Sequence, residues 1–528
     1  MYDGRQALPV KTTRIMNKAT CVFIAIGVFI FLTGCQPTGR PEAKQAQPVH
    51  NKHYVSIDGL WRVTPETALK FPNGTLEPVI RISGEAYGDL KVQGCFLWDK
   101  RFYDDWPIKS VTYTDSTRQL EIVYNEGAVY RGVVGKDRKT ITGVAYSDAW
   151  GDTTNRVHEN KLDFVRDEQT DENRLFFPRP ADVHGSMVYQ YHQPEQLDRY
   201  LQTASLLDYV KDTTAFYRLM ERIIKQKFGR LESILVLKDR KLVLEEYFYG
   251  YNRTHLHPIH SCTKSVTSLL LGIALNRHNK MDVDQPVFSF FPQYDSLKTP
   301  EKEKITLKHV LTMTPGFTDE DDFDAHSPDE EAQKILSLPM VSAPGEKFKY
   351  NGNCTNLMGD IIYSLENKQA DELAQEVLFN KLGISNFEWE RENGVVRCAS
   401  DLRMLPGDMA KIGLLVLNNG NWNGEQIVPK EWIAESTQPH VAESPFFDYG
   451  YQWWCRSKSN RSWWKHPVHG SRDEHDMFLA LGYGGQYIMV IRDLNMVVVA
   501  TSSDYNEENG MAHQKVPMVI EDVVPLFE

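Results

Sequence analysis

The alternation of apolar and polar residues predicts a β-rich segment in the N-terminal part of the chain. Leu120, Ile122 and Tyr124 recur at every second position, which is the pattern of a strand with one buried face. Short apolar runs of this kind follow one another about every ten residues, separated by turn residues. They cover 79–82, 90–97, 110–113, 120–124, 128–134, 140–145 and 162–165. We therefore expect residues 54–167 to form an antiparallel all-β barrel or sandwich.

The second part of the chain, residues 191–528, combines helical periodicity with two predicted hairpins. Leu219 and Ile223 follow the helical spacing, and a hairpin pattern begins shortly afterwards at 234–249. The second hairpin pattern, 486–501, lies near the other end of this part, and the segments between are mostly helical or loop-like. The simplest arrangement is an α+β fold, in which both ends form one antiparallel sheet flanked by helices and a helical subdomain is inserted. We expect a site between the sheet and the helical cluster.

One continuous apolar run, residues 21–32, lies near the start of the chain. It is too short to cross the ~30 Å hydrocarbon core of a bilayer, but it suits the apolar region of a signal peptide. The basic residues Lys11, Arg14 and Lys18 precede it, as such a peptide requires. We interpret residues 1–35 as an export signal; the alternative is a buried N-terminal helix.

The end of this run, Leu32-Thr33-Gly34-Cys35, resembles the lipobox of bacterial lipoproteins. The resemblance implies that Cys35 is acylated, for example with palmitate, and anchors an exported protein to a membrane of the cell envelope. Gln36 in place of an aspartate favours the outer membrane, with the protein facing the periplasm. The polar, proline-containing segments 36–53 and 168–190 are predicted as linkers.

Composition and charge exclude several classes of function. The 528 residues include 59 Lys and Arg against 71 Asp and Glu, which gives a net charge of −12. An acidic chain without a basic block repels phosphate backbones, so we expect no nucleic acid partner. The 7 cysteines are too few and too scattered for a disulfide framework, and none belongs to a CxxC or Cys/His cluster with zinc-ligand spacing. We expect no metal and no cofactor.

The candidate chemistry lies directly after the first hairpin. Ser261 precedes an apolar helical run with Val266 and Leu269, and Lys264 follows three residues after the serine. Residues three apart share a helix face, so the lysine amine can reach the serine hydroxyl. An amine buried against an apolar helix gives up its proton more easily than one in water, and can then accept the serine proton. The helix N-terminus adds partial positive charge where an oxyanion would develop.

The spacing S-x-x-K alone is not specific, because it occurs by chance in a chain of this length. It occurs a second time at Ser462–Lys465, where no apolar helix follows and a His-Pro pair favours an extended loop. The first match is distinguished by motifs that follow it in order. These are 261–265, 305–317, 344–350, 406–413 with Gly424 and Trp432, and 482–486.

In that order the motifs resemble those of the class C β-lactamase-like serine hydrolases, over about residues 212–528. The resemblance implies an acylated nucleophile at Ser261, with Lys264 as its proton acceptor. It also implies that Tyr350 shares the proton with the lysine and protonates the leaving group. The backbone N–H groups of Ser261 and Tyr483 would form the oxyanion hole.

Two departures from the family pattern change the expected substrate. Where the family has Tyr-x-Asn, this chain has Gly352, and its Lys-Thr-Gly is replaced by Ala480-Leu481-Gly482. The missing lysine removes a cation that would bind a substrate carboxylate. β-Lactamase or D-Ala-D-Ala carboxypeptidase activity is therefore disfavoured. The pattern is more similar to the esterase and 6-aminohexanoate-dimer hydrolase branch, which implies a small ester or amide substrate.

Two other functions remain open at this point. His255 and His257 have the H-x-H spacing of a dinuclear zinc hydrolase, with His260 nearby, but Ile259 occupies the position of the expected aspartate. An envelope lipoprotein could also keep a hydrolase fold without catalysis and bind glycan or peptide.

Several other residues near these motifs have structural interpretations. We expect Cys262 to be a small buried residue and Asp408 with Lys411 to form an ion pair. Four tryptophans could line an apolar acyl pocket or belong to the core, namely Trp453, Trp454, Trp463 and Trp464.

Overall fold

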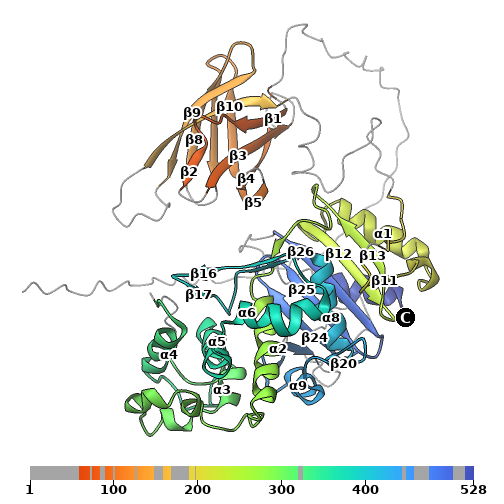
Figure 1. Ribbon diagram of the computed structural model, residues 1–528. Helices are drawn as coiled ribbons and strands as arrows, with labels where there is room; N and C mark the ends of the chain where they lie inside the picture. Colours follow the sequence, from red (N-terminus) through yellow and green to blue (C-terminus); the bar gives the residue numbers. More distant parts are fainter. Residues whose placement is uncertain are drawn as a thin grey trace, which may run out of the picture. The chain divides into compact units, whose positions relative to one another are not determined.

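The computed structural model gives the fold of the chain in segments (Figure 1). It describes residues 57, 59–71, 74–83, 90–98, 101–106, 108–124, 128–147, 158–167, 189–196, 198–318, 325–442, 448–456, 475–503 and 518–528. The predicted signal segment with Cys35, the linker 36–53 and the second S-x-x-K match lie outside these residues. Most of the linker 168–190 does so as well.

The described part of residues 59–167 is an all-β unit, as predicted. Its strands are β1 (Gly59–Val63), β2 (Leu69–Phe71), β3 (Gly74–Ser83), β4 (Lys91–Trp98), β5 (Arg101–Trp106), β6 (Ile108–Thr114), β7 (Gln119–Tyr124), β8 (Val129–Val134), β9 (Thr140–Ser147) and β10 (His158–Asp167). They form an antiparallel sheet in the order β5-β4-β3-β1-β10-β9-β8-β7-β6, with β2 paired to β3. The sheet curls until β4 and β6 lie in contact.

Aromatic side chains fill the interior of this curled sheet. Trp61, Tyr130 and Phe164 are almost completely buried, and the rings of Tyr130 and Phe164 meet edge to face at 5.4 Å between centroids. The Tyr130 hydroxyl donates to the Leu162 carbonyl over 3.0 Å, so its polar end is satisfied inside the core.

The C-terminal part is built around a second sheet, which joins the two predicted hairpins. Its strands among the described residues are β11 (Gln202–Thr203), β12 (Leu231–Lys238), β13 (Lys241–Tyr247), β21 (Val441–Ala442), β22 (Asp448–Tyr449), β23 (Trp454–Arg456), β24 (Met477–Gly482), β25 (Gln486–Ile491) and β26 (Met496–Ser502). The order is β11-β13-β12-β26-β25-β24-β23-β22-β21. The antiparallel pair β12–β26 joins the two ends of the region, as expected, and only the short β11 pairs in parallel within this described sheet.

Both faces of this sheet are covered, which explains the continuous apolar runs in its central strands. Along β12, Leu235 and Leu237 pack into the core on the side of α2 (Cys262–Arg277) and α8 (Pro406–Leu417). Ile234 and Val236 point to the opposite core, which contains α1 (Thr213–Ile224) and the C-terminal helical turns 519–526. Figure 1 shows α2 and α8 beside the sheet.

The inserted helices form the predicted subdomain on the other side of α2. They are α3 (Leu307–Leu311), α4 (Pro328–Ser337), α5 (Gly352–Glu366), α6 (Ala370–Ala374) and α7 (Asn380–Leu382), while α9 (Lys430–Ser436) follows α8. The helix α2 contacts both α5 and β24, so it lies between the subdomain and the sheet. No helix within the described residues has the length and apolar character needed to cross a bilayer.

Short strand pairs complete the fold. One small sheet has the order β14 (His257–Pro258), β18 (Leu402–Met404) and β15 (Phe387–Trp389), and β14 directly precedes α2 in the sequence. Two further hairpins pair β16 (Arg391–Glu392) with β17 (Val395–Val396) and β19 (Asn421–Trp422) with β20 (Glu425–Gln426). The expected ion pair is present in α8, where Lys411 Nζ lies 2.9 Å from Asp408 Oδ1. The same amine also lies 2.6 Å from Asp198 Oδ2.

Candidate active site

Helix α2 places Ser261 and Lys264 at its first turn. Ser261 occupies the N-cap position, but its hydroxyl makes no capping hydrogen bond and is therefore left for other partners. The preceding His260 has a positive φ of 47°, an uncommon conformation for a residue other than glycine. This turn brings the chain from β14 into the helix and leaves the serine side chain only partly buried.

The Lys264 amine is buried and held between two oxygen atoms. The side chain is only 5% exposed, and its Nζ donates to Ser261 Oγ over 3.1 Å and to the Ala399 carbonyl over 2.6 Å. The segment that supplies the carbonyl is itself fixed. Thr267 of α2 donates to the Cys398 carbonyl over 2.9 Å, and the Ala399 N–H donates to Asn356 of α5 over 3.1 Å.

Tyr350 reaches the same serine from the helical subdomain. It lies two residues before α5, and its hydroxyl shares a hydrogen bond with the Ser261 side chain. The Lys264 amine lies 5.1 Å from the centroid of its ring, and Trp454 stacks on the ring at 5.5 Å. Desolvation raises the pKa of Tyr350 to about 12, although the hydrogen bond to Ser261 opposes the shift. The structure thus brings Ser261, Lys264 and Tyr350 together, and Tyr350 is protonated at neutral pH.

The connection between β24 and β25 lies against the chain just before Ser261. A Cβ atom added to Gly482 would lie 2.3 Å from the Ile259 carbonyl, so only glycine fits at this approach. Gly484 and Gly485 have positive φ values of 76° and 100°, which turn the loop back into β25. Tyr483 is 48% exposed, and its ring lies 6.0 Å from that of His260. The predicted residue Tyr483 therefore stands beside the turn that carries Ser261.

The positions that depart from the family pattern have structural roles here. Ala480 is completely buried in the core shared with α2 and carries no charge toward the site. Gly352 is the first residue of α5, and the neighbouring Asn351 caps that helix by accepting from the Cys354 N–H over 3.2 Å.

The other residues singled out from the sequence lie as follows. Cys262 is buried, burial raises the pKa of its thiol, and its Sγ donates to the Gln486 carbonyl, which fits a structural residue. Trp453 belongs to the core, whereas Trp454 stacks on Tyr350. Trp463 and Trp464 lie outside the described residues.

The three histidines before the serine make separate contacts. His255 accepts from the Asn252 N–H over 3.2 Å, while the buried His257 lies 3.2 Å from Glu232. His260 lies beside Tyr483. In the described part of the chain, no three His, Cys, Asp or Glu side chains are grouped as metal ligands.

Sequence reasoning missed three residues that shape the site. Ala399 acts through its carbonyl oxygen, Asn356 accepts from the backbone N–H of Ala399, and Gln486 bonds to backbone groups of Tyr483 and Ser502. Backbone carbonyls have no signature in the sequence, and a single Asn or Gln carries too little signal to identify its partner.

Comparison with known proteins identifies a family for most of the C-terminal part. Residues 224–516, more than half of the 528, match the family described as Beta-lactamase. No curated protein matches the sequence.

Three solved structures are among those to which the chain is similar. One is described as a 6-aminohexanoate-dimer hydrolase from Bacillus anthracis, with 22% identity, 58% of this chain and 82% of that chain covered, and a TM-score of 0.46. A second, described as a beta-lactamase from Bacteroides dorei, has 17% identity and a TM-score of 0.47, and the match covers 59% of this chain and 99% of that chain. An octameric penicillin-binding protein homologue from Pyrococcus abyssi has 18% identity and a TM-score of 0.45, and the match covers 59% of this chain and 77% of that chain.

The close approach at Gly482 predicts the effect of one added methyl group. Gly482→Ala would place its Cβ 2.3 Å from the backbone oxygen of Ile259, so the loop must move away from the serine. We expect a loss of roughly 1–3 kcal/mol in the free energy of unfolding and a loss of about 100-fold in any Ser261-dependent hydrolysis. Urea unfolding and ester hydrolysis measure the two effects.

Gly407→Ala is the matched control, because no atom lies within 4 Å of a Cβ at that position in α8. It should leave hydrolysis unchanged and stabilise the helix by up to about 1 kcal/mol. Full activity in Gly482→Ala would contradict the placement of this loop.

Proposed function

Since the chain belongs to the Beta-lactamase family, we propose that it is a serine hydrolase that cleaves an ester or amide bond through an acyl-enzyme on Ser261. The observation that carries the proposal is the contact of Lys264 Nζ with Ser261 Oγ at 3.1 Å. The influence of a hydrogen bond from Ser261 on the pKa of Tyr350 supports it. A buried amine and a protonated phenol on one serine are what nucleophilic catalysis requires.

In the first half of the reaction, the neutral Lys264 amine accepts the proton of Ser261 while Oγ attacks the substrate carbonyl carbon. The negative charge that develops on the carbonyl oxygen is stabilised by the N–H groups of Ser261 and Tyr483 and by the N-terminus of α2. As the tetrahedral intermediate collapses, Tyr350 gives a proton to the departing alcohol or amine. The phenol then regains a proton from the lysine, so the amine is neutral again and the acyl group remains on Ser261.

In the second half, a water molecule replaces the alcohol or amine. The same lysine and tyrosine accept a proton from the water as its oxygen attacks the acyl carbon, and they return a proton to Ser261 Oγ as the acid leaves. The residues present are sufficient for both halves, so the proposed mechanism uses no cofactor and no metal.

The surroundings of the serine favour a small, uncharged ester or amide. The alanine at 480 offers no cation to a substrate carboxylate, which argues against penicillins and D-Ala-D-Ala peptides. Aromatic rings border the serine instead. Tyr350 with Trp454 lies on one side, and Tyr483 with His260 stands at the β24–β25 connection.

A fluorophosphonate probe tests the nucleophile directly. We expect the purified protein to be labelled once, at Ser261, and to hydrolyse p-nitrophenyl acetate, because the activated hydroxyl attacks phosphorus as it attacks a carbonyl carbon. Ser261→Ala should abolish both reactions, and peptide mass spectrometry should locate the label.

Two controls separate this function from its alternatives. Ser462→Ala, which alters the second S-x-x-K match, should leave labelling unchanged. EDTA should leave hydrolysis unchanged, whereas a zinc enzyme would lose it. Labelling that survives Ser261→Ala would refute the nucleophile, and a folded wild type without labelling or hydrolysis would favour a non-catalytic binding protein.

The pKa of Tyr350 leads to a pH prediction. At about 12 it keeps the phenol protonated between pH 6 and 9, so the lysine is the group that must lose a proton before it can act as the base. We therefore expect kcat/KM to rise with pH over this range. A rate that does not change from pH 6 to 9 would contradict this assignment.

Tyr350→Phe adds a test of the proton donor. The value of kcat should fall about 10²–10⁴-fold for an alkyl ester. It should fall less for a p-nitrophenyl ester, because p-nitrophenolate leaves without a proton.

We further propose that Cys35 anchors the protein to the outer membrane by an attached lipid, facing the periplasm. The lipobox-like segment 32–35 supports this proposal. In bacterial cells, the wild type should fractionate with membranes, and mass spectrometry should find an acylated N-terminal Cys35. Cys35→Ala should lose the acyl group. An unmodified Cys35 within an uncleaved chain would contradict the proposal.

A further inference from the structure

We propose that Gln486 is a positioning residue that holds the oxyanion loop, residues 482–485, in its working conformation. The proposal rests on the function proposed above, because the loop matters to catalysis only if Tyr483 supplies an oxyanion donor. Gln486 is the first residue of β25 and is only 1% exposed, so its polar side chain must find its partners inside the protein.

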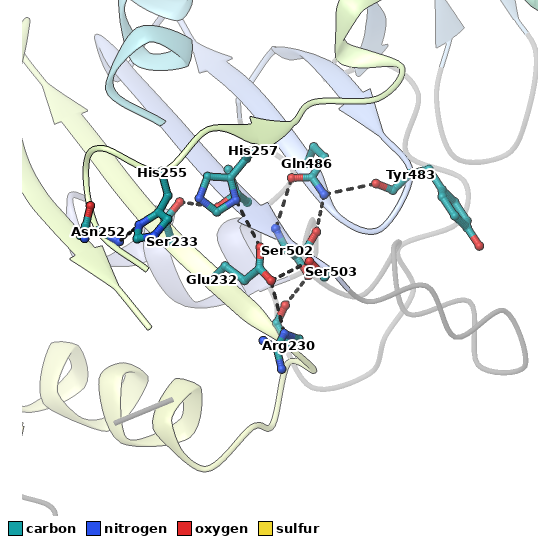
Figure 2. Close-up of polar contacts among 11 residues, drawn as sticks. Arg230, Glu232, Ser233, Asn252, His255, His257, Tyr483, Gln486, Ser502 and Ser503 are labelled. Carbon is teal, nitrogen blue, oxygen red and sulfur yellow. Dashed lines mark hydrogen bonds and ion pairs between the residues drawn. The ribbon is translucent and has the colours of Figure 1, made fainter. Parts of the chain in front are cut away.

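The side-chain amide of Gln486 joins two backbone segments. Its Nε2 donates to the carbonyl of Tyr483 over 3.3 Å and also to the carbonyl of Ser502, while its Oε1 accepts from the Ser502 N–H over 3.2 Å. Figure 2 shows the amide between these two residues, with the Tyr483 ring turned away from it. The loop is therefore fastened to the end of β26 through one side chain.

This contact acts on the residue whose N–H is assigned to the oxyanion hole. Tyr483 is followed by Gly484 and Gly485, both with positive φ values. Glycine pairs leave a backbone free to adopt many conformations. A hydrogen bond to the Tyr483 carbonyl holds the peptide between Tyr483 and Gly484. This peptide shares the Tyr483 Cα with the peptide that carries the Tyr483 N–H, so the hydrogen bond limits the direction of that N–H indirectly, by fixing its neighbour.

The strand end that holds Gln486 is itself connected to the segment that carries the nucleophile. Ser502 donates through its hydroxyl to the Arg230 carbonyl, and Ser503 donates to Glu232 over 2.6 Å (Figure 2). The other oxygen of Glu232 lies 3.2 Å from His257, three residues before His260.

The carboxylate at the centre of this network is charged. Burial would raise the pKa of Glu232, but the hydrogen bond and charge of His257, together with Arg230 and Ser503, lower it below the ordinary value. A buried carboxylate paired in this way is costly to displace. The segments that carry both proposed oxyanion donors are therefore tied to one buried carboxylate, that of Glu232.

A purely structural role for Gln486 is the competing explanation, because its amide also pairs with Ser502. The two roles differ in what they predict for the transition state. A structural residue affects stability, whereas a positioning residue changes the binding of a developing oxyanion in protein that remains folded.

Two substitutions of similar size separate these roles. Gln486→Met removes all three hydrogen bonds, and Gln486→Glu keeps an acceptor for the Ser502 N–H but loses the donors to both carbonyls. The control is Thr501→Val, which breaks a buried hydrogen bond of the same sheet, between the Thr501 and Ser233 hydroxyls at 2.6 Å, and removes none of the three Gln486 hydrogen bonds. For each purified protein we would measure thermal unfolding, the kcat and KM for p-nitrophenyl acetate, and inhibition by phenylboronic acid.

We expect both Gln486 variants to lose about 10–100-fold in kcat with KM within about twofold of the wild type. Phenylboronic acid forms a tetrahedral adduct with a serine, so its inhibition constant should rise by a similar factor. Thr501→Val should show lower thermal stability without these kinetic changes. If Gln486→Met does not fold, Gln486→Glu tests the loss of the amide donors with a side chain of the same length.

Two results would overturn the inference while the proposed function stands. One is a folded Gln486 variant with wild-type kcat and boronate affinity, and the other is an equal loss of kcat in Thr501→Val. A wild type that neither hydrolyses the ester nor reacts with the fluorophosphonate would overturn the proposed function itself, and with it this role for Gln486.

Discussion

A lysine amine that is buried beside a serine hydroxyl must have acceptors for its hydrogen bonds, and this requirement organises the C-terminal part of the protein. Lys264 lies on a helix that is buried almost throughout its length, and solvent contributes little to its surroundings. The Ala399 carbonyl supplies the second acceptor, and the segment that carries it is held by both α2 and α5. An unpaired amine at this position would cost more free energy than most single interactions provide. The fold therefore fixes the amine, and with it the serine that the amine contacts.

The site is assembled where the sheet meets the inserted helices, and each side contributes different chemistry. The helices bring the polar side chains, since Ser261 and Lys264 begin α2 and Tyr350 precedes α5. The sheet brings backbone, because the β24–β25 connection approaches the serine through Gly482 and presents no charged side chain at position 480. In the proposed function, the alanine at this position offers no cation to a substrate carboxylate, while the serine, lysine and tyrosine lie together at the start of α2 and before α5.

Sequence reasoning predicted the parts of this structure that depend on local pattern. The apolar runs between 79 and 165 each overlap a strand, because alternation is visible within a few residues. The strands β1, β2 and β5 were missed, since they are short or, in β5 (Arg101–Trp106), rich in charged residues. The pair of Ser261 with Lys264 follows from helical spacing, whereas Tyr350 and Tyr483 emerged only from the family resemblance. The roles of Ala399 and Gln486 could not be predicted. Ala399 acts through a backbone carbonyl that accepts from a lysine 135 residues away, and Gln486 bonds to backbone atoms of Tyr483 and Ser502, which no sequence pattern marks.

The most direct test of the central claim is a crystal structure of the fluorophosphonate adduct of the full chain. We expect a bond from Ser261 Oγ to phosphorus and a phosphoryl oxygen about 3 Å from the N–H groups of both Ser261 and Tyr483, with Lys264 still hydrogen-bonded to the Ala399 carbonyl. An adduct on another residue, or a phosphoryl oxygen directed away from those two N–H groups, would contradict it.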